Sequence, residues 1–137
     1  MRRVILEPMT SARPKRDGAA KIIRLYQIYD SHRDALLWFL QGLNAGSYDE
    51  YKRNYSGAST ERKYFTSVCG FFELSGVLVK RGLIDQDLFF DLFNPMPYWK
   101  RAKKIVLGMR KERPHIYENF ELLAKMREEW NRKRPSH

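Results

Sequence analysis

The apolar stretch from Tyr64 to Val79 is the feature that most limits what this chain of 137 residues can fold into. Its large apolar side chains recur at helical spacing, with Phe65, Val68, Cys69, Phe72 and Val79 on one face and Phe71, Leu74 and Leu78 widening it. A helix that is apolar nearly all round belongs at the centre of a bundle. Gly70 and Gly76 lie inside it, where glycine costs about 1 kcal/mol relative to alanine. Their presence favours a second backbone packed close to these positions.

Similar periodicity predicts neighbouring helices along the chain. Apolar residues at helical spacing predict helices over 18–30, over 61–81, over 86–93 and over 98–113. Ser31 and Asp34 resemble a capping box that begins a further helix ending near residues 42–46. A short helix followed by a loop is expected between Ser47 and Thr60, and a final helix has Pro114 in its first turn. Gly82 provides a helix stop and Asp85 an N-cap. No segment alternates with a period of two, so we predict an all-α, compact bundle of about six or seven helices.

The first 17 residues differ from the rest in composition. They contain Pro8, Pro14 and a set of basic residues without helical or alternating periodicity, namely Arg2, Arg3, Arg13, Lys15 and Arg16. We therefore predict an extended, flexible basic arm over 1–17 and a single helical domain over 18–134. The apolar residues after Arg3 are too few for a signal peptide, and no run approaches the roughly 20 apolar residues of a membrane span. These observations predict a cytoplasmic protein.

The charge distribution indicates the kind of partner. The chain has 26 Lys and Arg against 16 Asp and Glu, a formal net charge of +10, and much of the excess lies in the arm and in residues 98–113. In a helix over 98–113 the basic side chains occupy the face opposite the apolar residues. The predicted partner-binding residues are Lys100, Arg101, Lys103, Lys104, Leu107, Arg110 and Lys111. The arm residues Arg2, Arg3, Arg13, Lys15 and Arg16 add to this basic surface.

Three anionic partners satisfy these electrostatics. The leading hypothesis is a non-catalytic interaction module that docks on an acidic protein surface or a larger assembly. The alternative is nucleic-acid binding by the 98–113 helix and the arm, and anionic lipid headgroups are a third, peripheral contact. No helix-turn-helix, zinc-finger or RNA-recognition signature selects among them. Tyr98 and Trp99 fall on the apolar side, which favours a place in the core over base stacking.

Residues with catalytic or metal-binding potential are few. Glu73 lies inside the apolar run, so it needs a partner, for which Lys80, Arg81 or a basic residue of 98–113 is expected. His115 and Glu118 share a helix face. Because this is a single pair without further metal ligands, the polar residues common at the start of a helix explain it better than a metal site. The residues around Cys69 are apolar, which favours a buried, unreactive thiol over a catalytic nucleophile. The chain has no phosphate-binding glycine loop or hydrolase elbow, so we expect no cofactor and no metal and assign no catalytic residue. An enzyme that uses Glu73 or His115 is a third and weaker hypothesis for the function.

Part of the sequence resembles a known family. The segment FFELSGVLVKRGLIDQDLFFDLF, residues 71–93, is followed by Tyr98 and Trp99 and then by YENFELLA, residues 117–124. This pattern resembles a bacterial family of short helical proteins described only as a domain of unknown function, over roughly residues 19–130. The resemblance implies a helical fold and no particular reaction. Many members look membrane-tethered through an apolar N-terminal helix, and this chain has its basic segment there instead.

Overall fold

The computed structural model describes the backbone of residues 2–134 and the side chains of residues 17–134. Its elements are α1 (Arg2–Ser31), α2 (Arg33–Gln41), α3 (Tyr48–Asn54), α4 (Thr60–Lys80), α5 (Gln86–Leu92), α6 (Met96–Met109) and α7 (Glu118–Lys133). Residues 2–134 thus form seven helices and no strand, which confirms the predicted all-α bundle. None of the helices in this part of the chain combines the length and the apolarity that crossing a membrane requires.

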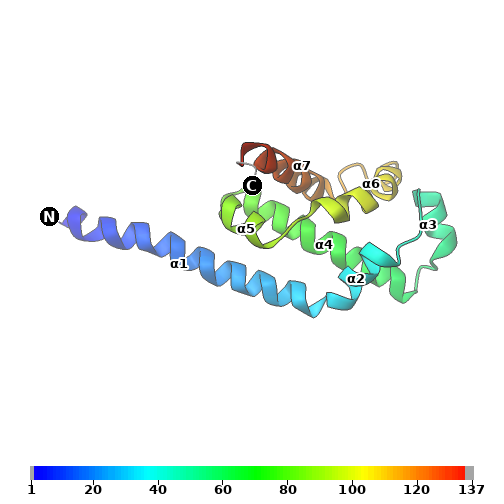
Figure 1. Cartoon of the computed structure of the whole chain (residues 1–137), viewed down its shortest axis with the longest axis horizontal. Helices are drawn as coiled ribbons and strands as arrows, with labels where there is room; N and C mark the ends of the chain where they lie inside the picture. Colours follow the sequence, from blue (N-terminus) through cyan, green and yellow to red (C-terminus); the bar gives the residue numbers. More distant parts are fainter. Residues whose placement is uncertain (1, 135–137) are drawn as a thin grey trace.

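Helix α4 lies at the centre of the bundle, as its apolar pattern predicts. It packs against α2 on one side and α7 on another, while α6 packs against α2, α3 and α7. Figure 1 shows α4 running between α2 on one side and α6 and α7 on the other. Phe65, Val68, Cys69 and Phe72 are fully buried on α4. Burial of such large side chains contributes roughly 1.5–3 kcal/mol each, which explains why this helix organises the fold.

Local signals set several helix ends. The Asp85 carboxylate accepts a hydrogen bond from the Leu88 amide at 3.0 Å, which confirms the predicted N-cap of α5. Gly82 follows α4 with φ of 71°, the left-handed conformation that favours glycine after a helix. Ser47 and Ser59 cap α3 and α4 by accepting bonds from Glu50 and Arg62.

The predicted basic arm over 1–17 falls in the N-terminal part of helix α1, which is assigned from Arg2. That this segment is extended and flexible stays a prediction. The side chains of Arg2, Arg3, Arg13, Lys15 and Arg16 lie outside the described residues, so their role stays a prediction, as does the domain division at residue 17.

Two predicted helix starts are wrong. The Ser31 hydroxyl donates to the Ile28 carbonyl at 2.6 Å and so belongs to the end of α1, whereas His32 is the N-cap residue of α2. The final helix begins at Glu118 instead of at Pro114. Tyr117 precedes it with φ of 56°, a left-handed conformation that separates α7 from the turns over 110–117.

Candidate partner-binding surface

Helix α6 carries the exposed basic surface. Its apolar side is buried as predicted, with Ala102, Ile105 and Val106 fully covered. The opposite side is exposed and holds Lys100, Arg101, Lys103 and Lys104, and Lys111 is exposed in the turn just after the helix; we call these five cations the α6 basic face. Leu107 lies among them and is 45% exposed. The buried residues anchor the helix while the cations remain available to a partner.

The cations of the α6 basic face lack partners among the described residues. None of the five lies in an ion pair within residues 17–134, although carboxylates elsewhere in that range pair with Arg33, Lys52, Lys125 and Arg132. Like charges on one helix face repel one another. Carboxylates placed among these cations would relieve this repulsion.

A cleft of about 400 Å³ borders one side of the α6 basic face, between α6 and α3. Lys104 and Leu107 line it from α6, Lys111 lines it from the turn after α6, and Tyr48 and Lys52 line it from α3. Gly108 allows this close packing, because a Cβ atom there would lie 2.4 Å from the Cβ of Tyr48. Lys52 lies over the Tyr48 ring, 4.4 Å from its centroid, so a further cation faces the cleft.

A second cleft, of about 310 Å³, borders the other side, between α6 and α7. Lys100 and Lys103 line it from α6 and Lys125 from α7, above apolar atoms of Trp99 and Ala124. Both clefts also have acidic rims, formed by Asp49 and Glu112 in the first and by Glu121 and Glu128 in the second. The surface is therefore basic along α6 but mixed in charge at its borders.

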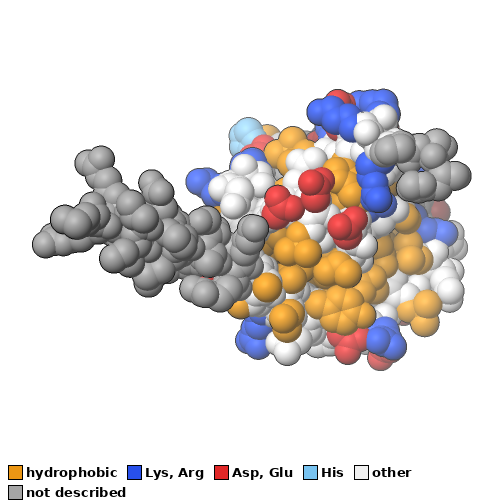
Figure 2. Space-filling view, turned by 60° about the vertical axis from the view of Figure 1, so that its left-hand side comes forward, with side chains coloured by type: hydrophobic (Ala, Val, Ile, Leu, Met, Phe, Trp, Pro, Cys, Tyr) orange, Lys and Arg blue, Asp and Glu red, His pale blue; other side chains and the backbone are white. Residues whose placement is uncertain are grey.

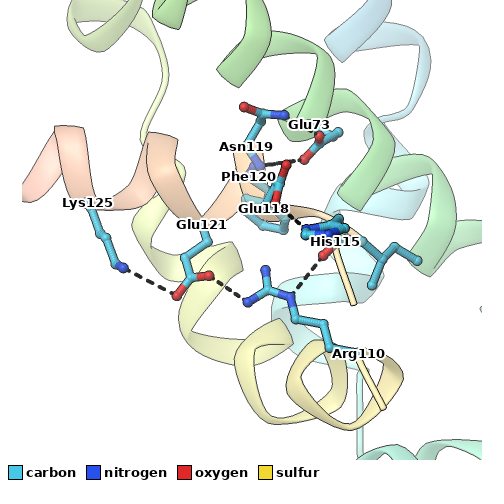
Figure 3. A network of polar contacts seen from close by, with 9 residues as sticks. Glu73, Arg110, His115, Glu118, Asn119, Phe120, Glu121 and Lys125 are labelled. Atoms are coloured by element: carbon cyan, nitrogen blue, oxygen red, sulfur yellow. Dashed lines mark hydrogen bonds and ion pairs between the residues drawn. The ribbon is translucent and has the colours of Figure 1, made fainter. Parts of the chain in front are cut away.

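Arg110 differs from the other predicted binding residues, because it points into the bundle. Its side chain is only 18% exposed. Its Nη1 donates to Glu121 Oε1 at 2.7 Å and its Nε donates to the Ile116 carbonyl at 3.1 Å. Figure 3 shows these bonds joining the end of α6 to α7. Arg110 holds the turn between the two helices, and a role in partner binding stays a prediction.

The charge of Arg110 acts on Glu121. Burial alone raises the pKa of the Glu121 carboxyl, but the hydrogen bond from Arg110 and the positive charges of Arg110 and Lys125 outweigh burial and lower the pKa below its ordinary value. Lys125 Nζ lies 3.5 Å from Glu121 Oε2. The ionised carboxylate therefore stabilises the folded state, and this contribution depends on pH.

Glu121→Gln is expected to lower the free energy of unfolding at neutral pH by about 1–2 kcal/mol, because a charge-assisted hydrogen bond becomes a neutral one. Since the folded-state pKa is lowered, the wild-type contribution is complete above the ordinary pKa and is lost as the pH falls through the lowered value. Urea unfolding of the two proteins should therefore converge in acid. The control is Glu128→Gln, which removes an exposed pair with Arg132 and should change little at either pH. A loss for Glu121→Gln that persists in acid would contradict this account.

Glu73 has a different partner from the one expected. Pairing with Lys80, Arg81 or a basic residue of 98–113 is wrong, because the carboxylate instead meets the first turn of α7. Its Oε1 accepts hydrogen bonds from the Asn119 and Phe120 amides at 3.0 and 2.9 Å, and its Oε2 accepts one from Asn119 Nδ2 at 2.8 Å. Figure 3 shows Glu73 reaching α7 from α4. The carboxylate thus acts as the N-terminal cap that α7 lacks in its own sequence.

The remaining candidates for chemistry have structural surroundings. Complete burial raises the pKa of the Cys69 thiol well above its ordinary value, and the charge of Glu73 raises it further, so the neutral thiol occupies the core. His115 Nδ1 lies 3.2 Å from Glu118 Oε2, and both side chains are exposed. Across the described residues, no group of three or more His, Cys, Asp or Glu is arranged to hold a metal ion.

Sequence reasoning missed Lys52, and it placed Lys125 in the basic stretch 125–134 without predicting its position beside α6. Lys52 and Lys125 lie on α3 and α7, and they face the α6 basic face only because those helices pack beside α6. No local motif marks the position of these two cations beside α6, and only a prediction of how the helices pack could have identified it.

Comparisons with known proteins place the chain in a family. No match exists among the curated proteins or among the solved structures. A family model described as Domain of unknown function (DUF4760) matches residues 17–130, which confirms the predicted resemblance to a family described as a domain of unknown function. Because this match covers most of the 137 residues, the chain belongs to this family of domains of unknown function.

Proposed function

We propose that the chain is a non-catalytic interaction module that docks an acidic, partly apolar segment of another protein on the α6 basic face. The observation that carries the proposal is the set of five exposed cations that lack an ion pair within the described residues. Four of them are held on helix α6, whose other side is buried in the core, and Lys111 lies in the turn that follows its last residue, Met109. Such a rigid array of charge favours a partner with matching carboxylates.

Two observations favour a protein segment over nucleic acid. The acidic rims of both clefts, formed by Asp49, Glu112, Glu121 and Glu128, repel a continuous line of phosphates but tolerate a partner that carries a few carboxylates. Tyr98 and Trp99 are buried, so neither presents a free ring on which a base could stack. Leu107, exposed between Lys104 and Lys111, offers an apolar contact to a protein partner.

The spacing of the cations indicates how the partner lies. The nine residues from Lys100 to the last residue of α6, Met109, correspond to roughly 14 Å along a helix at about 1.5 Å per residue, and Lys111 follows in the next turn. A partner helix lying along α6 would match this length with about three turns. Its carboxylates would face the lysines while an apolar side chain contacts Leu107.

Changing Lys100, Lys103, Lys104 and Lys111 together to Gln is expected to weaken binding by about 10- to 50-fold, because each exposed ion pair contributes roughly 0.2–1 kcal/mol. The probe is a fluorescein-labelled synthetic peptide of about five helical turns, with Glu and Leu at helical spacing. Fluorescence anisotropy measures its affinity for the wild type and the variant at several salt concentrations. Wild-type affinity should fall as salt rises.

A charge-matched variant separates the α6 basic face from the general charge of the protein. Arg53, Lys63, Lys80 and Arg81 are exposed on other parts of the surface, and none lies in an ion pair within the described residues. Their joint change to Gln removes the same charge and should weaken peptide binding less than about threefold, through long-range attraction alone. Equal losses in both variants would overturn the proposal. Preferential binding of single- or double-stranded DNA, or of anionic phospholipid vesicles, would also overturn it and assign the face to that partner.

A further inference from the structure

A groove of about 250 Å³ lies on a different part of the molecule, between α1 and α2. Most of its walls are apolar or aromatic, and they consist of Tyr26, Tyr29, Leu36, Leu37, Leu40 and Tyr98 together with the charged pair Asp30 and Arg33. The Tyr29 and Tyr98 hydroxyls lie 3.4 Å apart and form a hydrogen bond with each other. We call these residues the α1–α2 groove. It shares no residue with the two clefts beside the α6 basic face.

Large apolar side chains remain exposed around this groove. Tyr26 is 48% exposed and Leu37 is 53% exposed, and both line the groove. Ile23, one turn before Tyr26 on the same side of α1, is 59% exposed. Figure 2 shows apolar side chains gathered over a broad area beside the N-terminal segment. Contiguous exposed apolar surface of this kind marks a contact site.

The charges of the groove indicate what covers it. Its two charged residues, Asp30 and Arg33, form an ion pair with each other, so the groove is neutral on a chain of net charge +10. Two copies of a strongly basic protein repel one another over most of their surfaces. The neutral α1–α2 groove adds no repulsion of its own, and a strongly charged partner of either sign gains no attraction there.

The groove is also self-complementary. A twofold axis brings the same patch of two copies together, so each residue of one copy meets a residue of the same patch in the other. With an acid and a base in the patch, Asp30 of each copy can face Arg33 of the other, and Tyr26 and Leu37 can pack across the axis. We propose that the α1–α2 groove is the contact site for a second copy of this chain.

The size of the apolar area sets the expected strength. Three half-exposed side chains offer on the order of a few hundred Å² per copy, below the roughly 800 Å² per partner of a standard interface. Self-association is therefore weak, in the high-micromolar range. Salt screens the repulsion between the two basic copies, so self-association strengthens as salt rises. Docking on the α6 basic face has the opposite salt dependence, which keeps the two proposals separable.

Sedimentation velocity tests this proposal on the full chain, from low micromolar to several hundred micromolar protein, at low and high salt. The weight-average mass of the wild type should rise toward twice the monomer mass with concentration, more steeply at high salt. Leu37→Lys, an exposed substitution to a good helix former, should abolish the rise because it sets two cations across the axis. Ile23→Lys should reduce it.

The matched control is Leu74→Lys, at a leucine that is 44% exposed on α4 and outside the groove. It should associate like the wild type. The fourfold Gln variant of the α6 basic face should also associate, because it leaves the groove intact and lowers the repulsion. A wild type that stays monomeric at the highest concentration in both salts would overturn the proposal, and so would an equal loss for Leu74→Lys and Leu37→Lys.

Discussion

Gly76→Ala is expected to lower the free energy of unfolding by about 3 kcal/mol, the upper part of the range for overpacking a core. A Cβ atom at residue 76 would lie 2.2 Å from the Asn119 carbonyl oxygen and 2.7 Å from its carbon. These are backbone atoms of the first turn of α7, so no side-chain rotation can relieve the clash. The helices α4 and α7 would have to separate, which would also stretch the bonds that Glu73 makes to α7.

The same helix supplies the control for this substitution. Gly70 is exposed, and a Cβ atom there would meet nothing within 4 Å. Gly70→Ala is therefore expected to raise the free energy of unfolding by up to about 1 kcal/mol, through helix propensity alone. Urea or guanidinium unfolding of the three proteins measures both effects. Similar changes for the two variants would show that α4 and α7 do not pack closely at residue 76.

Glu73→Ala is expected to lower the free energy of unfolding by about 2–3 kcal/mol. It leaves the Asn119 and Phe120 amides without the acceptor that holds them, and an unsatisfied donor in a protected position costs roughly 1–3 kcal/mol. It also removes a negative charge from the N-terminus of a helix, which contributes about 0.3–1 kcal/mol. Glu73→Gln keeps an acceptor oxygen and should lie between Ala and the wild type.

The control for Glu73 is a second acid near the same helix end. Glu118 begins α7, but its carboxylate is exposed and contacts only His115 among the described residues. Glu118→Ala should therefore cost less than about 1 kcal/mol. Amide hydrogen exchange adds a local measurement, since Asn119 and Phe120 should lose protection in Glu73→Ala and keep it in Glu118→Ala. Unchanged protection in Glu73→Ala would contradict the capping role.

The predictions that the structure confirms depend on neighbours in sequence. The Asp85 cap joins residues three apart, the Gly82 stop depends on one residue's conformation, and the buried side of α6 follows from residues within a few turns. Each involves atoms that lie close together in any helical chain, so the pattern of residues is enough to predict them.

The contacts that the sequence did not predict join residues far apart in the chain or across a turn. Pro114 has the residue type for a helix start, but Glu73 lies 46 residues before Asn119 and holds the start of α7 instead. Arg110 shares the basic pattern of its helix, yet it points into the bundle because it donates hydrogen bonds to Glu121 and to the Ile116 carbonyl. Gly70 and Gly76 look alike in the sequence, and only Gly76 meets another backbone. No local pattern distinguishes these cases.

The sequence by itself determined the all-α class, the central place of α4 and the basic character of α6, because hydrophobic and charge periodicity along a helix decides which side is buried. Only the tertiary structure decided which side chain caps α7 and that the Arg110 side chain points into the bundle. It also decided which helices place Lys52 and Lys125 beside the α6 basic face. The physical reason is range: periodicity acts over a few turns, whereas hydrogen bonds and ion pairs between helices depend on how the whole chain packs.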